Sequence, residues 1–444
     1  MQLKIPAHLL KKEQLAICVG LTLLPFNAVA GLLPLLFASL RPWFFHGKKL
    51  ASLPLAKVWA ALTLWFLLTT ITAHNRGEAL LGLANFVPYF IVFLAFSQVI
   101  CQFKQLNNLA WLLTANTVVL CVIGFGQIYG GWATPDWLAA IGTNLVAGGR
   151  PEGRMSSLLM YANLFSAWLL MVFPLSLGLL IQSVRRWHFT ASGFALNPPP
   201  LVWALLGACI LEAIALVLTG SRSAWGIGLL IAVAYAIYLG WYWLVALAAG
   251  ATAMVLWASF GPFGKEPLRQ IVPRYFWGRL SDELYPDRYT TALRSTQWKF
   301  SWDMFLDQPI FGQGLRNFTP LYQAAMNVWI GHPHNLVLML LGETGLIGTL
   351  LMLGAVGLIL AQGAILLTNL AHCTGFLRRS QHLLLFSYGL AFAALCLYNL
   401  FDVTIFDMRN NVLGWTFLAA IAGVSQRYGP KLAQGSLAKL SVSG

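Results

Sequence analysis

The stretch WIGHPHNLVLMLLGETGLIG, residues 329–348, places two histidines directly before a long apolar run. The run continues to residue 367 and contains a single acidic residue, Glu343. A helix needs roughly 20 apolar residues to cross the hydrocarbon core of a bilayer. Residues 334–367 are therefore predicted to span a membrane, with His332 and His334 at its surface.

The composition excludes an ordinary soluble protein. Of the 444 residues, 58% are hydrophobic and 9% are charged, whereas soluble domains carry about 25% charged residues. We expect an all-α polytopic membrane protein. The basic first residues, MQLKIPAHLLKKEQ, precede an apolar run without a small-residue cleavage site, so the first helix is expected to remain as an anchor. The six cysteines form no CxxC pair and are interpreted as packing residues.

Hydropathy predicts about twelve membrane-spanning segments in three parts: residues 1–258 with nine spans, a large loop at 259–333, and residues 334–444 with three spans and a tail. The first two spans are short, and one helix broken around Pro25 is the alternative. The turn between the eighth and ninth spans is expected near Gly240. The predicted spans are 13–26, 27–43, 54–73, 78–101, 106–130, 157–182, 199–219, 223–240, 241–258, 334–367, 381–404 and 410–426.

Lysine and arginine pairs indicate the orientation of these spans. These basic residues fall on one side of the predicted topology: Lys11 and Lys12, Lys48 and Lys49, Lys104, Arg185 and Arg186, Arg378 and Arg379, and Arg427 with Lys431. That side is expected to be cytoplasmic and to hold both termini, because basic loops stay inside. The net charge of +14 then reflects this bias and the binding of an anionic substrate, so nucleic acid is not an expected partner.

The loop at 259–333 is the largest element on the opposite side, and loops of this length usually carry function. Its stretch TALRSTQWKFSWDMFLDQP has apolar residues at helical spacing, which predicts an amphipathic helix on the membrane surface. The following FGQGLRNF indicates a glycine-containing turn. The loop contains six acids and these eight basic residues: Lys265, Arg269, Arg274, Arg279, Arg288, Arg294, Lys299 and Arg316.

His334 is the first candidate for chemistry. Pro333 suits the first position of a helix, so we expect the helix to begin there and its dipole to favour a neutral imidazole, which can act as a base. The alternative is an interfacial histidine that only ends a helix. The pair His332 and His334 could also bind a metal, but no Cys/His cluster nearby in the sequence completes a site, so no metal is expected.

Arg222 and Arg294 are the candidate anion-binding residues. Arg222 lies at the predicted end of one span or the start of the next, and Ser221 is a plausible N-cap. An arginine there could bind an anionic headgroup beside helix N–H groups, or could only anchor the helix at the interface. Arg294 lies on the polar side of the predicted surface helix, where most arginines are solvated or contact lipid phosphate.

Four acids lie within or beside the predicted spans. Glu212 and Glu343 are inside spans, where carboxylates are costly and usually paired or functional. Glu343 is nine residues after His334, about 13 Å along a helix, so it is expected to pair with another helix or to shape a groove. Asp402 and Asp407 mark the end of the eleventh span, where either could orient a histidine or an arginine, or only end the helix.

Together these motifs resemble the signature of the O-antigen ligase and O-antigen polymerase superfamily of bacterial membrane glycosyltransferases. HNLVLMLLGETGLIG follows the large loop, as the family's histidine motif does. LTGSRSAWG (218–226) resembles its arginine motif, ALRSTQWKFSWDMFLDQPIFGQGLRNF (292–318) its loop motif, and YANLFSAWL (161–169) another recurrent segment. The resemblance covers roughly residues 150–425.

The resemblance implies a GT-C-like fold and an enzyme of the bacterial inner membrane whose site faces the periplasm. His334 would be the catalytic base, and Arg222 and Arg294 would bind the diphosphate of a glycan linked to undecaprenyl diphosphate. The implied reaction is metal-independent and inverting, needs no cofactor, and transfers the glycan to a glycolipid or glycan acceptor during polysaccharide or lipopolysaccharide synthesis. Supporting candidates are His332, Asn335, Gly345 and Gly348, followed by Asp402, Glu343 and Arg288.

Two alternatives stay open. A polymerase of the same superfamily would differ from a ligase in its acceptor, which the sequence does not show. Some family members are named as bicarbonate transporters, and intramembrane Glu212 and Glu343 would suit a coupled carrier. The basic loop at 259–333 and the lack of an inverted repeat favour the enzyme.

Overall fold

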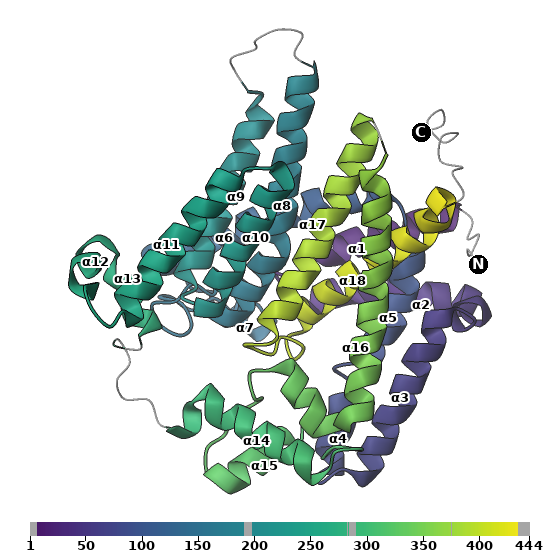
Figure 1. The fold of residues 1–444 in the computed structure, drawn as a ribbon. Helices are drawn as coiled ribbons and strands as arrows, with labels where there is room; N and C mark the ends of the chain where they lie inside the picture. The colour runs from purple at the N-terminus through teal and green to yellow at the C-terminus, as the bar shows by residue number, and fades with distance from the viewer. Residues whose placement is uncertain (1–6, 191–197, 282, 284–289, 374, 434–444) are drawn as a thin grey trace.

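The computed structural model describes residues 7–190, 198–281, 283, 290–373 and 375–433. The described chain contains helices and no strand, and ten of its helices are long and apolar enough to cross a membrane (Figure 1). The predicted all-α polytopic fold is therefore confirmed. The two other predicted spans coincide with α1 (Ala7–Leu23) and α18 (Met408–Ala433), which fall outside this set of ten.

The first two predicted spans are separate helices. The chain turns after α1, and Asn27 caps α2 (Ala28–Ala51) by accepting the Ala30 N–H at 2.9 Å. Gly20 and Gly31 allow the two helices to pack closely, because a Cβ on Gly20 would lie 2.5 Å from the Leu35 side chain. The next helices are α3 (Pro54–Thr72), α4 (Arg76–Leu83), α5 (Val87–Val99) and α6 (Phe103–Tyr129).

The middle of the chain contains the most and the least buried spans. In α8, 78% of the apolar window is buried, whereas in α11 the share is 11%, so α8 is central and α11 lies at the edge. Gly240 ends α10 in a left-handed conformation, as the predicted turn there requires. The elements are α7 (Asp136–Ala140), η1 (Ser157–Leu159), α8 (Ala162–Thr190), α9 (Pro200–Leu218), α10 (Arg222–Leu239) and α11 (Tyr242–Phe260).

The large loop contains short helices at one end of the bundle (Figure 1). The predicted surface helix is α14, which packs on α16 (Leu336–Ala371) at Ser301 and Met304 and leaves Trp302 45% exposed. Phe300 packs against Phe318 and Tyr322 of α15, whereas Trp302 remains available to lipid. The loop elements are α12 (Lys265–Ile271), α13 (Arg274–Leu280), η2 (Thr290–Ala292), α14 (Arg294–Asp307) and α15 (Phe318–Met326).

The last part of the chain is α16 (Leu336–Ala371), α17 (Phe376–Tyr398) and α18. α16 is broken at Gly345, whose φ of 68° and ψ of −174° are non-helical. A helix broken at membrane depth needs outside partners for its freed backbone groups. The partners here are Gln313 N–H to Gly342 O (2.9 Å), Gly314 N–H to Glu343 O (2.9 Å), Trp65 Nε1 to Thr344 O (3.0 Å) and Leu346 N–H to Pro309 O (2.8 Å).

Candidate functional site

His334 lies in a turn directly before α16. The helix begins at Leu336, and Asn335 is its N-cap, accepting the Leu338 N–H at 3.0 Å. The prediction that Pro333 takes the first helical position is therefore wrong, because the Asn335 side chain caps the helix two residues later. His334 itself has φ of +54°, a left-handed conformation that non-glycine residues rarely adopt and that often marks functional sites.

Asp402, in the turn between α17 and α18, holds the His334 ring. Its Oδ1 lies 3.0 Å from His334 Nδ1 and also accepts the Val403 N–H at 2.9 Å. The Asp402 side chain is 8% exposed, whereas that of His334 is 29% exposed. Burial would raise the pKa of Asp402, but the hydrogen bond from His334 and the positive charges of His332, His334 and Arg294 lower it to about 2.

The ionised Asp402 determines the tautomer of His334. A carboxylate only accepts hydrogen bonds, so the bond to Oδ1 requires a proton on His334 Nδ1. In a neutral ring the lone pair is then on Nε2, which has no hydrogen bond to protein within the described residues. This arrangement is suited to a base whose free nitrogen faces a ligand.

His332 supports the same turn. Its Nδ1 accepts the His334 N–H at 3.2 Å, so its neutral form carries the proton on Nε2, 3.7 Å from Asp402 Oδ1. Burial lowers the pKa of His332 to about 4, the charges of His334 and Arg294 add to this shift, and Asp402 opposes it. At neutral pH His332 is therefore uncharged, and His334 remains the closer partner of the carboxylate.

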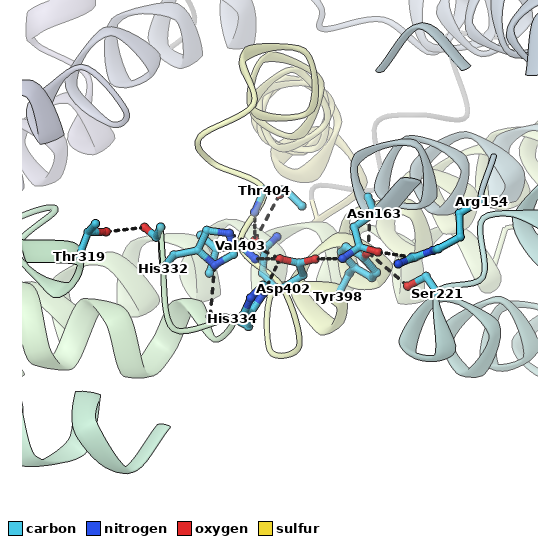
Figure 2. A network of polar contacts seen from close by, with 12 residues as sticks. Arg154, Asn163, Ser221, Thr319, His332, His334, Tyr398, Asp402, Val403 and Thr404 are labelled. Carbon is cyan, nitrogen blue, oxygen red and sulfur yellow. Dashed lines mark hydrogen bonds and ion pairs between the residues drawn. The ribbon is translucent and has the colours of Figure 1, made fainter. Parts of the chain in front are cut away.

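A polar network continues from Asp402 to two residues that the sequence analysis did not select (Figure 2). Asn163, in α8, donates from Nδ2 to Asp402 Oδ2 at 2.6 Å. Arg154 donates from Nη2 to Asn163 Oδ1 at 2.6 Å and from Nε to Thr219 O at 2.7 Å. A signal for Arg154 existed in the sequence, since it stands in a short loop on the side where few basic residues are expected.

Arg222 lies at the far end of this network, at the first position of α10. Ser221 is the N-cap residue by position, but its side chain makes no capping bond, and its Oγ lies 3.4 Å from Tyr398 Oη. Arg222 Nη1 donates to the Arg279 carbonyl at 2.6 Å. The guanidinium groups of Arg154 and Arg279 both approach Gly220, because a Cβ there would lie 3.2 Å from Arg154 Nε and 3.1 Å from Arg279 Nη2.

Arg294 begins α14 and is near the histidine end of the network. Its charge lowers the pKa of both His332 and Asp402. Arg294 is thus near enough for its charge to act on His332 and Asp402, and the bonds of Asn163 and Arg154 join Asp402 to Thr219, three residues before Arg222. Arg288, the remaining predicted arginine, lies outside the described residues.

A family model described as O-antigen ligase matches residues 207–353. The chain carries an O-antigen ligase superfamily domain. The matched segment contains Arg222, Arg294 and His334, and extends beyond Gly348. No curated protein matches the chain. Arg154, Asn163 and Asp402 lie outside the matched O-antigen ligase segment, so their association with it comes from the geometry.

The glycines and Glu343 of the O-antigen ligase domain belong to the scaffold of α16. Glu343, 2% exposed, accepts the N–H of Phe318, the first residue of α15, at 3.2 Å. Gly345 forms the helix break, and Gly348 packs against α3, where a Cβ would lie 2.9 Å from Trp65 Cδ1. The prediction that Glu343 pairs with another element is confirmed, and its partner is a helix N-terminus.

Two other predicted acids have ordinary partners. Glu212 accepts the Ser176 hydroxyl at 2.8 Å in the core of the bundle. Asp407 accepts the Asn410 N–H at 2.9 Å at the start of α18, so Asp402 is the acid that orients a histidine.

The fold brings an acidic residue to the two histidines, although no Cys/His cluster lies near them in the sequence. Ligand atoms of His332, His334 and Asp402 lie within 4.8 Å of one another and could hold a metal ion. Asp402 is distant in sequence, so this grouping required the fold. The 3.0 Å bond between His334 Nδ1 and Asp402 Oδ1 would have to break for these two atoms to ligate one ion.

Proposed function

We propose that this protein is an inverting glycosyltransferase of the O-antigen ligase type. It would move a glycan from a polyprenyl diphosphate carrier to an acceptor hydroxyl at the periplasmic face of the inner membrane. The observation that carries the proposal is the hydrogen bond from His334 Nδ1 to the ionised Asp402, which leaves Nε2 as a base. The family match to residues 207–353 supports a lipid-linked glycan as the substrate.

The proposed step is a single displacement. The acceptor oxygen forms a bond to the anomeric carbon while the bond from that carbon to the diphosphate oxygen breaks. The acceptor proton moves to His334 Nε2, and the bonding electrons leave with the polyprenyl diphosphate. Attack opposite the leaving group inverts the anomeric carbon. The resulting imidazolium is stabilised by Asp402, which is 3.0 Å from Nδ1.

The arginines would stabilise the charge that develops on the diphosphate. A guanidinium presents a planar fork of donors that matches phosphate oxygens, and it keeps its charge in a partly buried site. Arg222 and Arg294 are the first residues of α10 and α14, and both would bind the diphosphate in this proposal. Fixed cations can replace the metal ion that other glycosyltransferases use, so we propose a metal-independent reaction.

The position of α14 supports a donor held at the membrane surface. Trp302, Leu306 and Ile310 are 45%, 58% and 55% exposed at this end of the bundle, where a polyprenyl chain would enter from lipid. The acceptor, either a glycolipid for a ligase or a second lipid-linked glycan for a polymerase, would approach from the aqueous side. We take the ligase as the leading hypothesis and the polymerase as its alternative.

The transporter alternative loses part of its support. It rested on the names of some family members and on Glu212 and Glu343 as intramembrane acids. Glu343 accepts a backbone N–H that starts α15, and Glu212 accepts a serine hydroxyl. Both contacts are those of structural carboxylates.

The test uses purified protein in detergent with polyprenyl diphosphate-linked oligosaccharide, a panel of acceptors and excess chelator. We expect acceptor-dependent release of polyprenyl diphosphate that His334→Ala abolishes. Arg222→Lys should weaken it strongly, because lysine lacks the bidentate fork. Loss of release with chelator would reject metal independence. Full activity in both variants would reject the site, and bicarbonate flux into proteoliposomes without lipid-linked sugar would reject the enzyme.

A further inference from the structure

Asn163 connects the base to the turn that carries Arg222, here called the arginine turn and defined as residues 219–222. Its Nδ2 donates to Asp402 Oδ2, and its Oδ1 accepts from Arg154, which also bonds the Thr219 carbonyl (Figure 2). Each of these three hydrogen bonds is between 2.6 and 2.7 Å long. A continuous path of charge-assisted bonds therefore runs from His334 to the arginine turn.

A second path joins the same two places. The Tyr398 hydroxyl donates to the backbone carbonyl of Asn163 at 3.0 Å and lies 3.4 Å from Ser221 Oγ in the arginine turn. Asn163 thus contacts the turn through its side chain, by way of Arg154, and through its backbone, by way of Tyr398. Two paths that meet at one residue restrain its position more than either path does alone.

The chemistry of the neighbours defines how the Asn163 amide points. Arg154 can only donate and the ionised Asp402 can only accept, so Oδ1 must face Arg154 and Nδ2 must face Asp402. The amide therefore holds Asp402 Oδ2 and leaves Oδ1 for His334. A neutral amide placed between the cation and the anion keeps Arg154 from pairing directly with Asp402 and pulling the carboxylate away from the histidine.

We propose that Asn163 and Arg154 are positioning residues that hold the base and the arginine turn in one fixed geometry. Asn163 would keep Asp402 oriented so that His334 carries its proton on Nδ1. Arg154 would do this through Asn163 and would also hold the arginine turn through Thr219 O. The proposal rests on the proposed function for its kinetic consequences, but the tautomer of His334 is a consequence that needs no substrate.

The two residues should differ in their kinetic effects. Asn163→Leu removes both amide contacts but leaves Thr219 alone, so kcat should fall about tenfold or more, since a 1 Å misplacement can cost roughly 100-fold. The KM for the lipid-linked donor should change by less than about threefold, because the donor arginines keep their positions. Arg154→Met also removes the bond to Thr219 O, which holds the arginine turn. We therefore expect kcat to fall and the donor KM to rise.

The direct test is the 15N spectrum of histidine-labelled protein in detergent, recorded at about pH 8, where an ordinary imidazole is neutral. Subtraction of the His334→Ala spectrum assigns the His334 signals. We expect the Nδ1-protonated tautomer in the unmodified protein and a shift to the Nε2-protonated tautomer, favoured by free imidazole, in Asn163→Leu. Asn163→Gln keeps the C=O and NH2 of the amide but displaces them by one methylene. We expect this variant to fold and to show a partial change to the Nε2-protonated tautomer, so it replaces Asn163→Leu in the test if that variant does not fold.

Asn116→Leu is the matched control. Asn116 is a buried asparagine in α6, whereas Asn163 is partly buried; the Asn116 amide bonds to the Leu21 carbonyl at 3.1 Å and makes no hydrogen bond to the network. Asn116→Leu should lower the stability of the protein about as much as Asn163→Leu does. It should leave the His334 tautomer, kcat and the donor KM unchanged. A purely structural role for Asn163 would make the two leucine variants behave alike.

The outcomes separate the positioning proposal from the proposed function. An unchanged His334 tautomer in Asn163→Leu and in Asn163→Gln overturns the positioning role, whatever the kinetics. An unchanged donor KM in Arg154→Met overturns the link to the arginine turn. If the unmodified protein transfers no glycan, the proposed function fails, while the tautomer shift still decides whether Asn163 orients Asp402 and His334.

Discussion

Glu343 and Asp402 are both buried carboxylates in the last third of the chain, but their partners differ. Glu343 accepts the backbone N–H of Phe318, and the main chain around it is held by a neighbouring loop. Asp402 accepts from the side chains of His334 and Asn163. A carboxylate bonded to main chain stabilises a fold, whereas one bonded to an imidazole with a free second nitrogen can take part in proton transfer.

The same contrast applies to the two glycine-rich places in the O-antigen ligase domain. Gly345 lets loop residues approach α16 and complete its hydrogen bonds. Gly220 instead lets two guanidinium groups approach the arginine turn. The contact at Gly345 joins the loop to α16. The contact at Gly220 places two positive charges at the arginine turn, where an anionic ligand would bind.

Asp402→Asn should have the largest effect. The substitution keeps the shape but removes the charge that stabilises an imidazolium and selects its tautomer. We expect the rate of glycan transfer to fall roughly 100- to 10,000-fold, with the thermal unfolding temperature close to that of the unmodified protein. Polyprenyl diphosphate release and a melting curve on the same preparation measure both. Near-normal transfer would remove the distinction between the two carboxylates.

Gly345→Ala should be the most damaging change in the scaffold. A Cβ at residue 345 would lie 2.0 Å from the Ile310 carbonyl oxygen, and the backbone conformation there is nearly exclusive to glycine. We expect a loss of about 3 kcal/mol or more in the free energy of unfolding. Gly354→Ala in the same helix is the control, because a Cβ there meets nothing within 4 Å. Equal stabilities would contradict the role assigned to the break.

Local sequence patterns predicted the elements but not most of the contacts between them. The apolar runs gave α16 and its neighbours, and helical spacing gave α14. Asn163 lies in YANLFSAWL, the segment that resembles a recurrent one of the superfamily, but its role depends on Asp402, 239 residues away. The role of Glu343 likewise depends on α15, whose start at Phe318 cannot be related to α16 without the fold.

The start of α16 shows a subtler limit. Pro333 followed by His334 is typical of a helix start, yet Asn335 competes for the same role with a side chain that caps the helix. The cap moved the helix start and left His334 in a left-handed turn. Local propensity placed the helix start three residues too early, at Pro333 instead of Leu336, and the His334 turn makes hydrogen bonds with Asp402 and His332 instead of continuing the helix.

His332→Asn should make the protein less sensitive to acid. The unfolded chain binds a proton at His332 near pH 6.5, whereas the folded protein does so only near pH 4, so folding stability falls as the pH decreases between these values. At about 1.4 kcal/mol per pH unit, the loss approaches roughly 3 kcal/mol. Asparagine can accept the His334 N–H in place of Nδ1 but cannot titrate.

Melting temperatures of both proteins at about pH 7 and about pH 4.5 measure this difference. Other groups that face His332 are Asp402, His334 and Arg294, and they are present in both proteins. The Asp402 contribution to stability is present above the unfolded pKa near 3.9 and is lost only as the pH falls through about 2. An acid-induced loss of stability that is equal in the two proteins would exclude His332 as its source.

Glu343→Gln should have the smallest effect and completes the comparison with Asp402→Asn. Glutamine can still accept the Phe318 N–H, and the change weakens the attraction of the side chain to the N-terminus of α15 and to Arg316. That attraction is worth about 1 kcal/mol, so a slightly lower melting temperature and a transfer rate within about twofold of normal are expected. The two variants make the same chemical change in two buried acids. Loss of transfer in Glu343→Gln at normal stability would mean that this carboxylate acts in the reaction or in a coupled flux, and would return the carrier hypothesis to consideration.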